Sequence, residues 1–134
     1  MPSQAPTVKT PGAKRAAKGE HHFDLAKLGK VQGGPDYTTA TGACVEGDRM
    51  IVALMHMPAG TRSEPHWHPN EQWIFVVEGT FRAKIGEQEV EAFPRSVLYI
   101  PANLVHSMTV APEADGLFFT VKDASYGLQG IRAS

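Results

Sequence analysis

Short runs of alternating apolar and polar residues, separated by turn residues, fill most of the chain. Such alternation is typical of strands that bury one face. Glycine, proline and acidic residues interrupt the runs at short intervals, and no long amphipathic helix lies between them to connect parallel strands. The expected strands are residues 37–45, 50–57, 72–77, 80–85, 88–92, 97–100, 106–110 and 117–121. The pattern therefore predicts an all-β sandwich or small barrel.

The beginning of the chain has a different pattern. It is rich in proline and basic residues and has almost no apolar bulk. Such a segment buries too little apolar surface to offset the entropy cost of ordering it. We therefore expect a flexible N-terminal tail over residues 1–22 and a single domain over residues 23–134. A short helix is expected at 23–30, with Asp24 as its N-cap and Gly29 as its end.

Composition limits the classes of function. The chain has 134 residues, of which 42% are hydrophobic and 20% are charged, and its net charge is −1. A nucleic-acid or anionic-membrane partner would require a concentrated basic patch, so we expect neither. Cys44 is the one cysteine, so the chain cannot be stabilised by an internal disulfide bond. The start of the chain lacks the apolar region of a secretory signal. We therefore expect a cytoplasmic protein that acts on a small molecule.

Candidate metal ligands gather in the stretch 60–72. In an extended chain His66 and His68 project to the same face, because residues two apart share a face. Gln72 has the same parity, and a barrel can bring His106, at the start of a later strand, opposite these residues. Imidazole is the commonest ligand for transition metals in proteins. These residues predict a site for one divalent transition metal, Fe, Mn, Ni or Zn.

Glu71 is the alternative fourth ligand. Strand parity points its side chain away from the histidine pair, so we rank Glu71 below Gln72. Glu71 is also a candidate for moving protons at the site, as are Tyr99 and His56. No residue pattern indicates an organic cofactor, a phosphate-binding loop or a nucleophilic triad.

The spacing of the first cluster resembles a known motif. Gly60, His66, His68, Gln72 and Gly79 stand at the positions of the first cupin motif, G-x5-H-x-H-x3-E-x6-G. The one departure is Gln72, which occupies the position of the motif's glutamate. The exchange removes the only anionic ligand, although an amide oxygen can still coordinate a metal.

A looser match follows in the second half of the chain. Pro101, Asn103 and His106 resemble the core of the second cupin motif, P-x-G-x2-H, with Asn103 at the glycine position. Arg95 stands where the leading glycine of that motif belongs, and Val110 stands where its closing asparagine belongs. This half of the resemblance depends on the proline, the histidine and the register.

The cupin resemblance covers roughly residues 40–121. It implies a double-stranded β-helix, or jelly-roll barrel, with the metal inside one open end. Small cupins of one domain are commonly homodimers, so we expect a homodimer here.

The resemblance also implies classes of function. Three neutral imidazoles and an amide leave the charge of the metal uncompensated, which favours an anionic or dicarbonyl-type substrate. With iron and oxygen the chemistry would be dioxygenation, and with a redox-silent metal it would be isomerase or lyase chemistry. The alternatives are a non-catalytic cupin that binds a sugar or organic acid, and a structural cupin that needs no metal.

Overall fold

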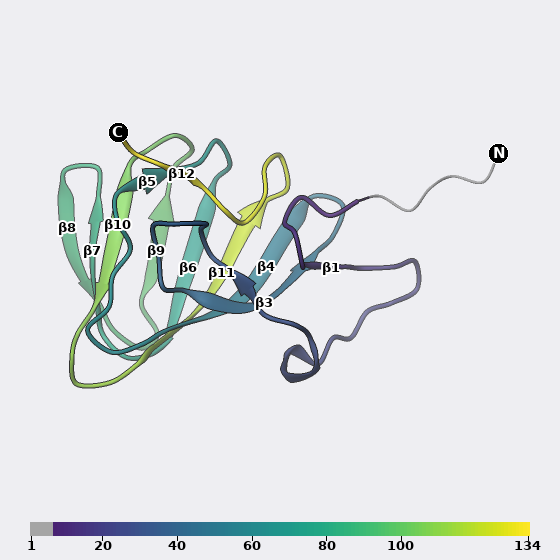
Figure 1. The fold of residues 1–134 in the computed structure, drawn as a ribbon, viewed down its shortest axis with the longest axis horizontal. Helices are drawn as coiled ribbons and strands as arrows, with labels where there is room; N and C mark the ends of the chain where they lie inside the picture. Colours follow the sequence, from purple (N-terminus) through teal and green to yellow (C-terminus); the bar gives the residue numbers. More distant parts are fainter. Residues whose placement is uncertain (1–6) are drawn as a thin grey trace.

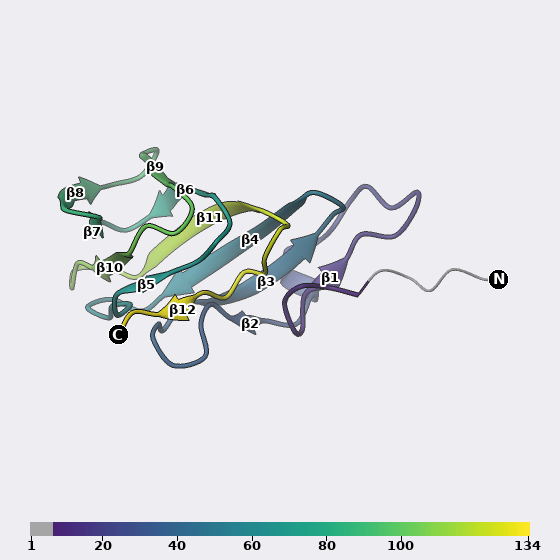
Figure 2. The same ribbon diagram turned by 90° about the horizontal axis from the view of Figure 1, so that it is seen from above.

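The computed structural model describes residues 7–134 as a nearly all-β fold (Figure 1). Its strands are β1 (Lys14–Arg15), β2 (Val31–Gln32), β3 (Thr41–Glu46), β4 (Met50–Met57), β5 (His66–Trp67), β6 (Gln72–Glu78), β7 (Phe81–Ile85), β8 (Gln88–Ala92), β9 (Val97–Ile100), β10 (His106–Val110), β11 (Gly116–Asp123) and β12 (Ile131–Arg132). The larger sheet has the strand order β1-β3-β4-β11-β6-β9, with β2 paired to β3, and the smaller sheet has the order β12-β5-β10-β7-β8. The two sheets form a jelly roll, which confirms the predicted fold class. Figure 2 shows β3 and β4 extending past the smaller sheet.

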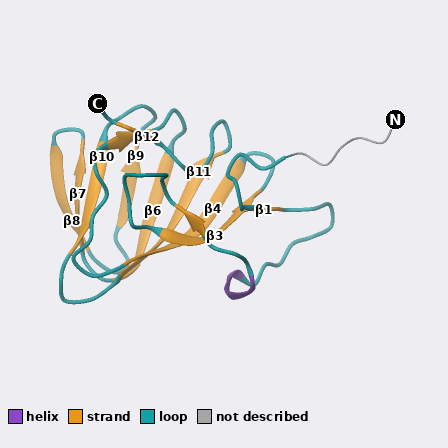
Figure 3. Ribbon diagram, in the orientation of Figure 1, coloured by secondary structure: helices purple, strands orange, loops and turns teal. Residues whose placement is uncertain are grey.

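The longer strands agree with the alternation in the sequence. The strands β4, β8, β9 and β10 begin and end where the pattern predicts. The strands β1, β2, β5 and β12 have two residues each, which is too short for alternation to be visible. The helix expected at 23–30 is a single 3₁₀ turn, η1 (Leu25–Lys27), drawn in purple in Figure 3. Asp24 caps this turn as predicted, by accepting a hydrogen bond from the Ala26 N–H.

The core lies between the two sheets. It is built from the inward residues of the alternating strands, and Phe81 and Phe118 meet edge to face with ring centroids 5.7 Å apart. Gly116 makes room for this contact, because a Cβ atom there would lie 2.4 Å from the Phe81 ring. No helix in residues 7–134 is long and apolar enough to cross a membrane.

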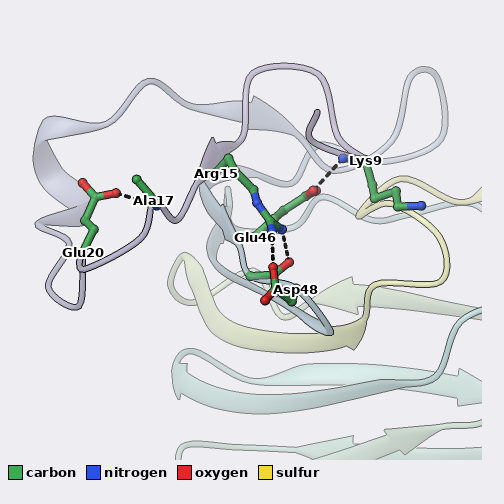
Figure 4. Close-up of polar contacts among 7 residues, drawn as sticks. Lys9, Arg15, Ala17, Glu20, Glu46 and Asp48 are labelled. Atoms are coloured by element: carbon green, nitrogen blue, oxygen red, sulfur yellow. Dashed lines mark hydrogen bonds and ion pairs between the residues drawn. The ribbon is translucent and has the colours of Figure 1, made fainter. Parts of the chain in front are cut away.

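The described part of the N-terminal segment lies against β3 (Figure 4), where the sequence predicts a flexible tail. β1 pairs in parallel with β3, and the side chain of Glu46 at the end of β3 accepts a hydrogen bond of 2.6 Å from the Lys9 N–H. Arg15 contacts the backbone carbonyl of Gly47 and the carboxylate of Asp48. These are backbone and charge contacts with a sheet edge. A composition argument that considers only apolar burial does not detect them. The first six residues of the predicted tail lie outside the described residues.

The glycine positions of the cupin pattern coincide with left-handed backbone. Gly60 and Gly79 have φ values of +75° and +80°. Arg95 and Asn103, which replace the pattern's glycines in the second motif, have φ values of +78° and +69°. Asparagine tolerates this conformation better than most residues, whereas arginine adopts it at a cost. All four positions therefore have left-handed backbone, whether or not the residue is glycine.

An apolar face lies on the outside of the larger sheet. Trp73 and Phe75 of β6 stand opposite Tyr99 and Val97 of β9, and each of these four side chains is at least 41% exposed. The Trp73 and Tyr99 rings also contact one another, with centroids 4.6 Å apart. Large contiguous apolar surfaces of this kind mark interaction sites in proteins.

We expect a homodimer that buries this outer face. In sedimentation velocity the wild-type chain should run as a dimer, and Phe75→Lys should shift it toward the monomer, because a buried lysine charge at an apolar contact is costly. Val105→Lys, at an exposed apolar residue outside β6 and β9, is the matched control and should leave the dimer intact. A monomeric wild type would contradict the expectation.

Candidate metal centre

The fold brings the predicted ligands together at one end of the barrel interior. His66 on β5 is the direct register partner of His106 on β10. Their ring centroids are 4.3 Å apart, and the ring of His68 lies 4.8 Å from that of His106. Gln72 opens β6 with its side chain inward. Three polar side chains from residues 66–72 and one from a later strand therefore share one largely buried site.

Each histidine ring of this group is oriented by a hydrogen bond to a nearby backbone carbonyl. The Nδ1 atoms of His66, His68 and His106 lie 2.7, 2.7 and 2.8 Å from the backbone carbonyl oxygens of Glu64, Asn70 and Leu104. A carbonyl oxygen can only accept, so each Nδ1 carries the hydrogen and donates it. The lone pair of each neutral ring is therefore on Nε2. Second-sphere carbonyls orient metal-binding histidines in this way.

The Gln72 side chain has a fixed orientation. The Thr120 hydroxyl donates to the Trp73 carbonyl oxygen at 3.0 Å, so its oxygen is free to accept from Gln72 Nε2 at 2.8 Å. In this orientation the amide oxygen of Gln72 lies 3.0 Å from His68 Nε2. His68 Nδ1 holds the ring hydrogen, so two lone pairs face each other at this distance.

Facing lone pairs in a buried site repel one another unless a proton or a cation lies between them. A proton is disfavoured, because burial lowers the pKa of His68 to about 4. Burial likewise lowers the pKa of His66 to about 4, and burial together with the nearby His66 lowers that of His106 to about 2. All three rings are therefore neutral near pH 7. His106 Nε2 is also buried without a hydrogen-bond partner.

These features fit a metal cation. The orphaned Nε2 atom of His106 and the His68–Gln72 pair supply lone pairs, and imidazole nitrogen with an amide oxygen is a donor set that transition metals accept. Among residues 7–134 no three His, Cys, Asp or Glu side chains already converge in a metal-binding arrangement. The predicted ligands therefore lie close together in this structure without forming a complete metal-binding arrangement.

The other sequence candidates lie elsewhere. Glu71 is exposed and accepts a 2.5 Å hydrogen bond from the Tyr99 hydroxyl on the outer face, so the fold brings Gln72 and not Glu71 to the histidines. His56 on β4 points outward and lies 2.8 Å from the Asp115 carboxylate, near the opposite end of β11 from Gln72. The structure does not bring Glu71, Tyr99 or His56 to the cluster.

Two residues at the site were missed by sequence analysis. Asn70 is completely buried, and its amide group donates to the carbonyl oxygens of Asp123, Tyr126 and Gly127. It thereby ties the loop after β11 to the carbonyl that holds His68.

Lys122 has its Nζ in the interior, where it donates to the Leu128 carbonyl oxygen, and burial lowers its pKa to about 7. Only the inward parity of Lys122 on β11 could have revealed it.

A cavity of about 50 Å³ adjoins the cluster. His66, Gln72 and Lys122 contribute polar groups to its wall, and the rest of the wall is mainly apolar or already hydrogen-bonded. The Tyr37 ring stacks on His66 with centroids 4.2 Å apart and completes one side. The cavity therefore reaches two of the four predicted ligands, His66 and Gln72.

Comparisons with known proteins agree with this fold. Residues 53–122 match the family described as Cupin domain, which is just over half of the 134 residues, so the chain belongs to the cupin family. Comparison with curated proteins finds no match.

Several solved structures share the fold. The polyketide cyclase RemF from Streptomyces resistomycificus has a TM-score of 0.69 at 18% identity, with 78% of this chain and 80% of that chain covered. KdgF from Halomonas sp. has a TM-score of 0.67 at 17% identity, covering 78% and 93%. An RmlC-like cupin from Shewanella frigidimarina has a TM-score of 0.66 at 13% identity, covering 78% and 92%. At these identities the likeness is one of fold.

The buried histidines predict a pH dependence of stability. In chelator-treated protein the free energy of unfolding should fall as the pH is lowered from about 7 to about 5, because the unfolded chain takes up protons near its ordinary histidine pKa of about 6.5. The folded chain resists protonation of His66 and His68 down to a pKa of about 4. The contribution is therefore complete above about pH 6.5 and is lost as the pH falls below it.

Urea unfolding at a series of pH values measures this effect. His22→Asn, which removes an exposed histidine, is the control and should show the same decline as the wild type. A wild-type stability that stays flat between about pH 7 and about pH 5 would show that the cluster is not held in the neutral form.

Proposed function

We propose that this cupin is a metal-dependent enzyme that acts on a small anionic or dicarbonyl-type metabolite. Its metal would be one divalent transition ion held by His66, His68, His106 and Gln72. The observation that carries the proposal is the gathering of three neutral histidine rings whose Nδ1 hydrogens are all donated to backbone carbonyls, which leaves their lone pairs on Nε2. The buried His106 Nε2 without a partner supports the same conclusion.

The surrounding residues prepare these ligands for binding. The carbonyls of Glu64, Asn70 and Leu104 hold the three ring hydrogens on Nδ1 and so keep each Nε2 lone pair available. Thr120 holds the Gln72 amide with its oxygen turned toward His68. Ligands that are already oriented lose little conformational freedom on binding, which favours high affinity.

The donor set favours Lewis-acid chemistry. A divalent metal held by neutral ligands would polarise an oxygen of a bound substrate without changing its own oxidation state. The similarity in fold to a polyketide cyclase is compatible with such non-redox chemistry. The Tyr37 ring shields one face of His66 from water. We therefore favour isomerase or lyase chemistry over dioxygenation.

Metal content tests the proposal directly. Protein purified without a polyhistidine tag should contain close to one metal ion per chain by inductively coupled plasma mass spectrometry. His106→Ala should lose the metal, and Gln72→Ala should bind it at least about tenfold more weakly, because each removes a donor atom. Glu71→Ala is the matched control from the neighbouring position and should keep the full metal content, because its carboxylate is on the outer face.

The identity of the metal then directs the activity assay. Nickel, zinc or manganese would lead to isomerase and lyase assays, and iron would lead to oxygen-consumption assays on the same substrates. Wild-type protein that stays free of metal after reconstitution would overturn the proposal. A Glu71→Ala variant that loses metal as severely as Gln72→Ala would overturn the assigned ligand set.

A further inference from the structure

Lys122 places its amino group in the interior of the barrel, where burial lowers its pKa to about 7 and a carboxylate bound beside it would favour the charged ammonium form. Only 4% of the residue is exposed, and Lys122 lines the cavity that His66 and Gln72 also line. An ammonium group has three N–H donors. In the described residues one of these goes to the Leu128 carbonyl oxygen, which leaves two for other partners.

No counter-charge accompanies this ammonium group. Among residues 7–134 no carboxylate lies within ion-pair distance of Lys122. The buried carboxylate of Glu46 accepts from the Lys9 N–H, and that of Asp123 accepts from the N–H groups of Glu71 and Ser125. Cys44 lies near Lys122, but burial raises the pKa of its thiol to about 12, so it stays neutral. A buried charge without a partner is costly in free energy.

The other polar groups of the cavity wall are largely engaged. The Tyr37 hydroxyl donates to the Gly33 carbonyl oxygen and accepts from the Gly130 N–H. The Ser63 hydroxyl accepts from the Met108 N–H and donates to the Met108 carbonyl oxygen. Gln72 and Thr120 bind one another. Lys122 is therefore the charged group with free donors on this wall.

We propose that Lys122 anchors the carboxylate of the substrate in this cavity, beside the predicted ligands. The inference rests on the proposed function and adds to it the class of substrate, a small carboxylate. The carboxylate accepts the two free N–H groups of Lys122, while the remainder of the molecule extends toward His66 and Gln72. Charge-assisted hydrogen bonds between ammonium and carboxylate are among the stronger contacts available in a buried site.

Size and charge both restrict the substrate. One water takes up about 10–15 Å³ of such a space, so a cavity of about 50 Å³ accommodates a molecule about the size of acetate or pyruvate. A divalent metal on neutral ligands together with the Lys122 ammonium would place several positive charges around the same cavity. Their repulsion is relieved when an anion lies between them. A neutral isostere of the same shape lacks this stabilisation.

Calorimetric titration of the protein as purified tests the anchor. Acetate, pyruvate and malonate are the probes, and pyruvamide is the neutral isostere of pyruvate. The wild type should bind at least one of the three carboxylates, and it should bind pyruvamide more weakly than pyruvate. Lys122→Met, which keeps the apolar stem and removes the charge, should weaken carboxylate binding by about tenfold or more and leave pyruvamide binding unchanged. Lys84→Met, at an exposed lysine on β7, is the control and should bind as the wild type does.

A second measurement does not depend on any variant. In protein labelled with ¹³C-lysine, the Lys122 Cε resonance should move on addition of the carboxylate that binds and stay in place with pyruvamide. Equal carboxylate binding by the wild type and a folded Lys122→Met would overturn the anchor. An unmoved Lys122 resonance at saturating carboxylate, or a wild type with no carboxylate binding at concentrations up to about 10 mM, would also overturn it.

Metal analysis of the same samples separates this inference from the proposed function. Lys122→Met should retain the wild-type metal content, because Lys122 is not among the ligands. Metal-free wild-type protein that still binds carboxylate through Lys122 would refute the metal site alone. Metal-loaded protein whose carboxylate affinity is the same in the wild type and in Lys122→Met would refute the anchor alone.

Discussion

The hydrogen bonds from the three histidine Nδ1 atoms to backbone carbonyls are the interaction on which the candidate site depends. Each of these bonds fixes one ring hydrogen and so leaves a lone pair on Nε2 in a buried space. Gln72 adds an amide oxygen whose direction is set by Thr120. Burial lowers the pKa of each histidine and removes protonation as a way to neutralise these lone pairs. A cation bound at the proposed site would take up these lone pairs.

Strand pairing supports this interaction from several directions. Register places His66 directly beside His106, and the turn before His106 is joined to the first cluster because the Asn103 N–H donates to the His68 carbonyl oxygen at 2.8 Å. Asn70 ties the loop after β11 to the same region. The left-handed conformation at Asn103 shapes this turn. Backbone geometry is thus conserved by the fold even where the glycine of the cupin pattern is absent.

The interior combines a neutral ligand set with a cationic side chain. The histidines and Gln72 carry no negative charge, and Lys122 brings a positive charge to the wall of the adjoining cavity. In a low-dielectric interior such charges interact strongly, so the cavity as a whole favours an anion. The contrast with the outer face is clear, because that face presents Trp73, Phe75 and Tyr99 to the solvent. The chain therefore has a cluster of polar groups at one cavity of its interior and an apolar face on the outside of its larger sheet.

The sequence by itself determined the fold class and the limits of four strands, and it predicted the histidine cluster. Alternation and motif spacing are local properties that can be read from the sequence alone. For this reason the limits of β4, β8, β9 and β10 were predicted to the residue. Only the tertiary structure placed Glu71, Tyr99 and His56 on the outside and packed the N-terminal segment against β3. It also brought Lys122 to the cavity. These outcomes depend on which strands pair and which loops cover an edge, and such contacts join residues too far apart in the chain for local periodicity to encode them.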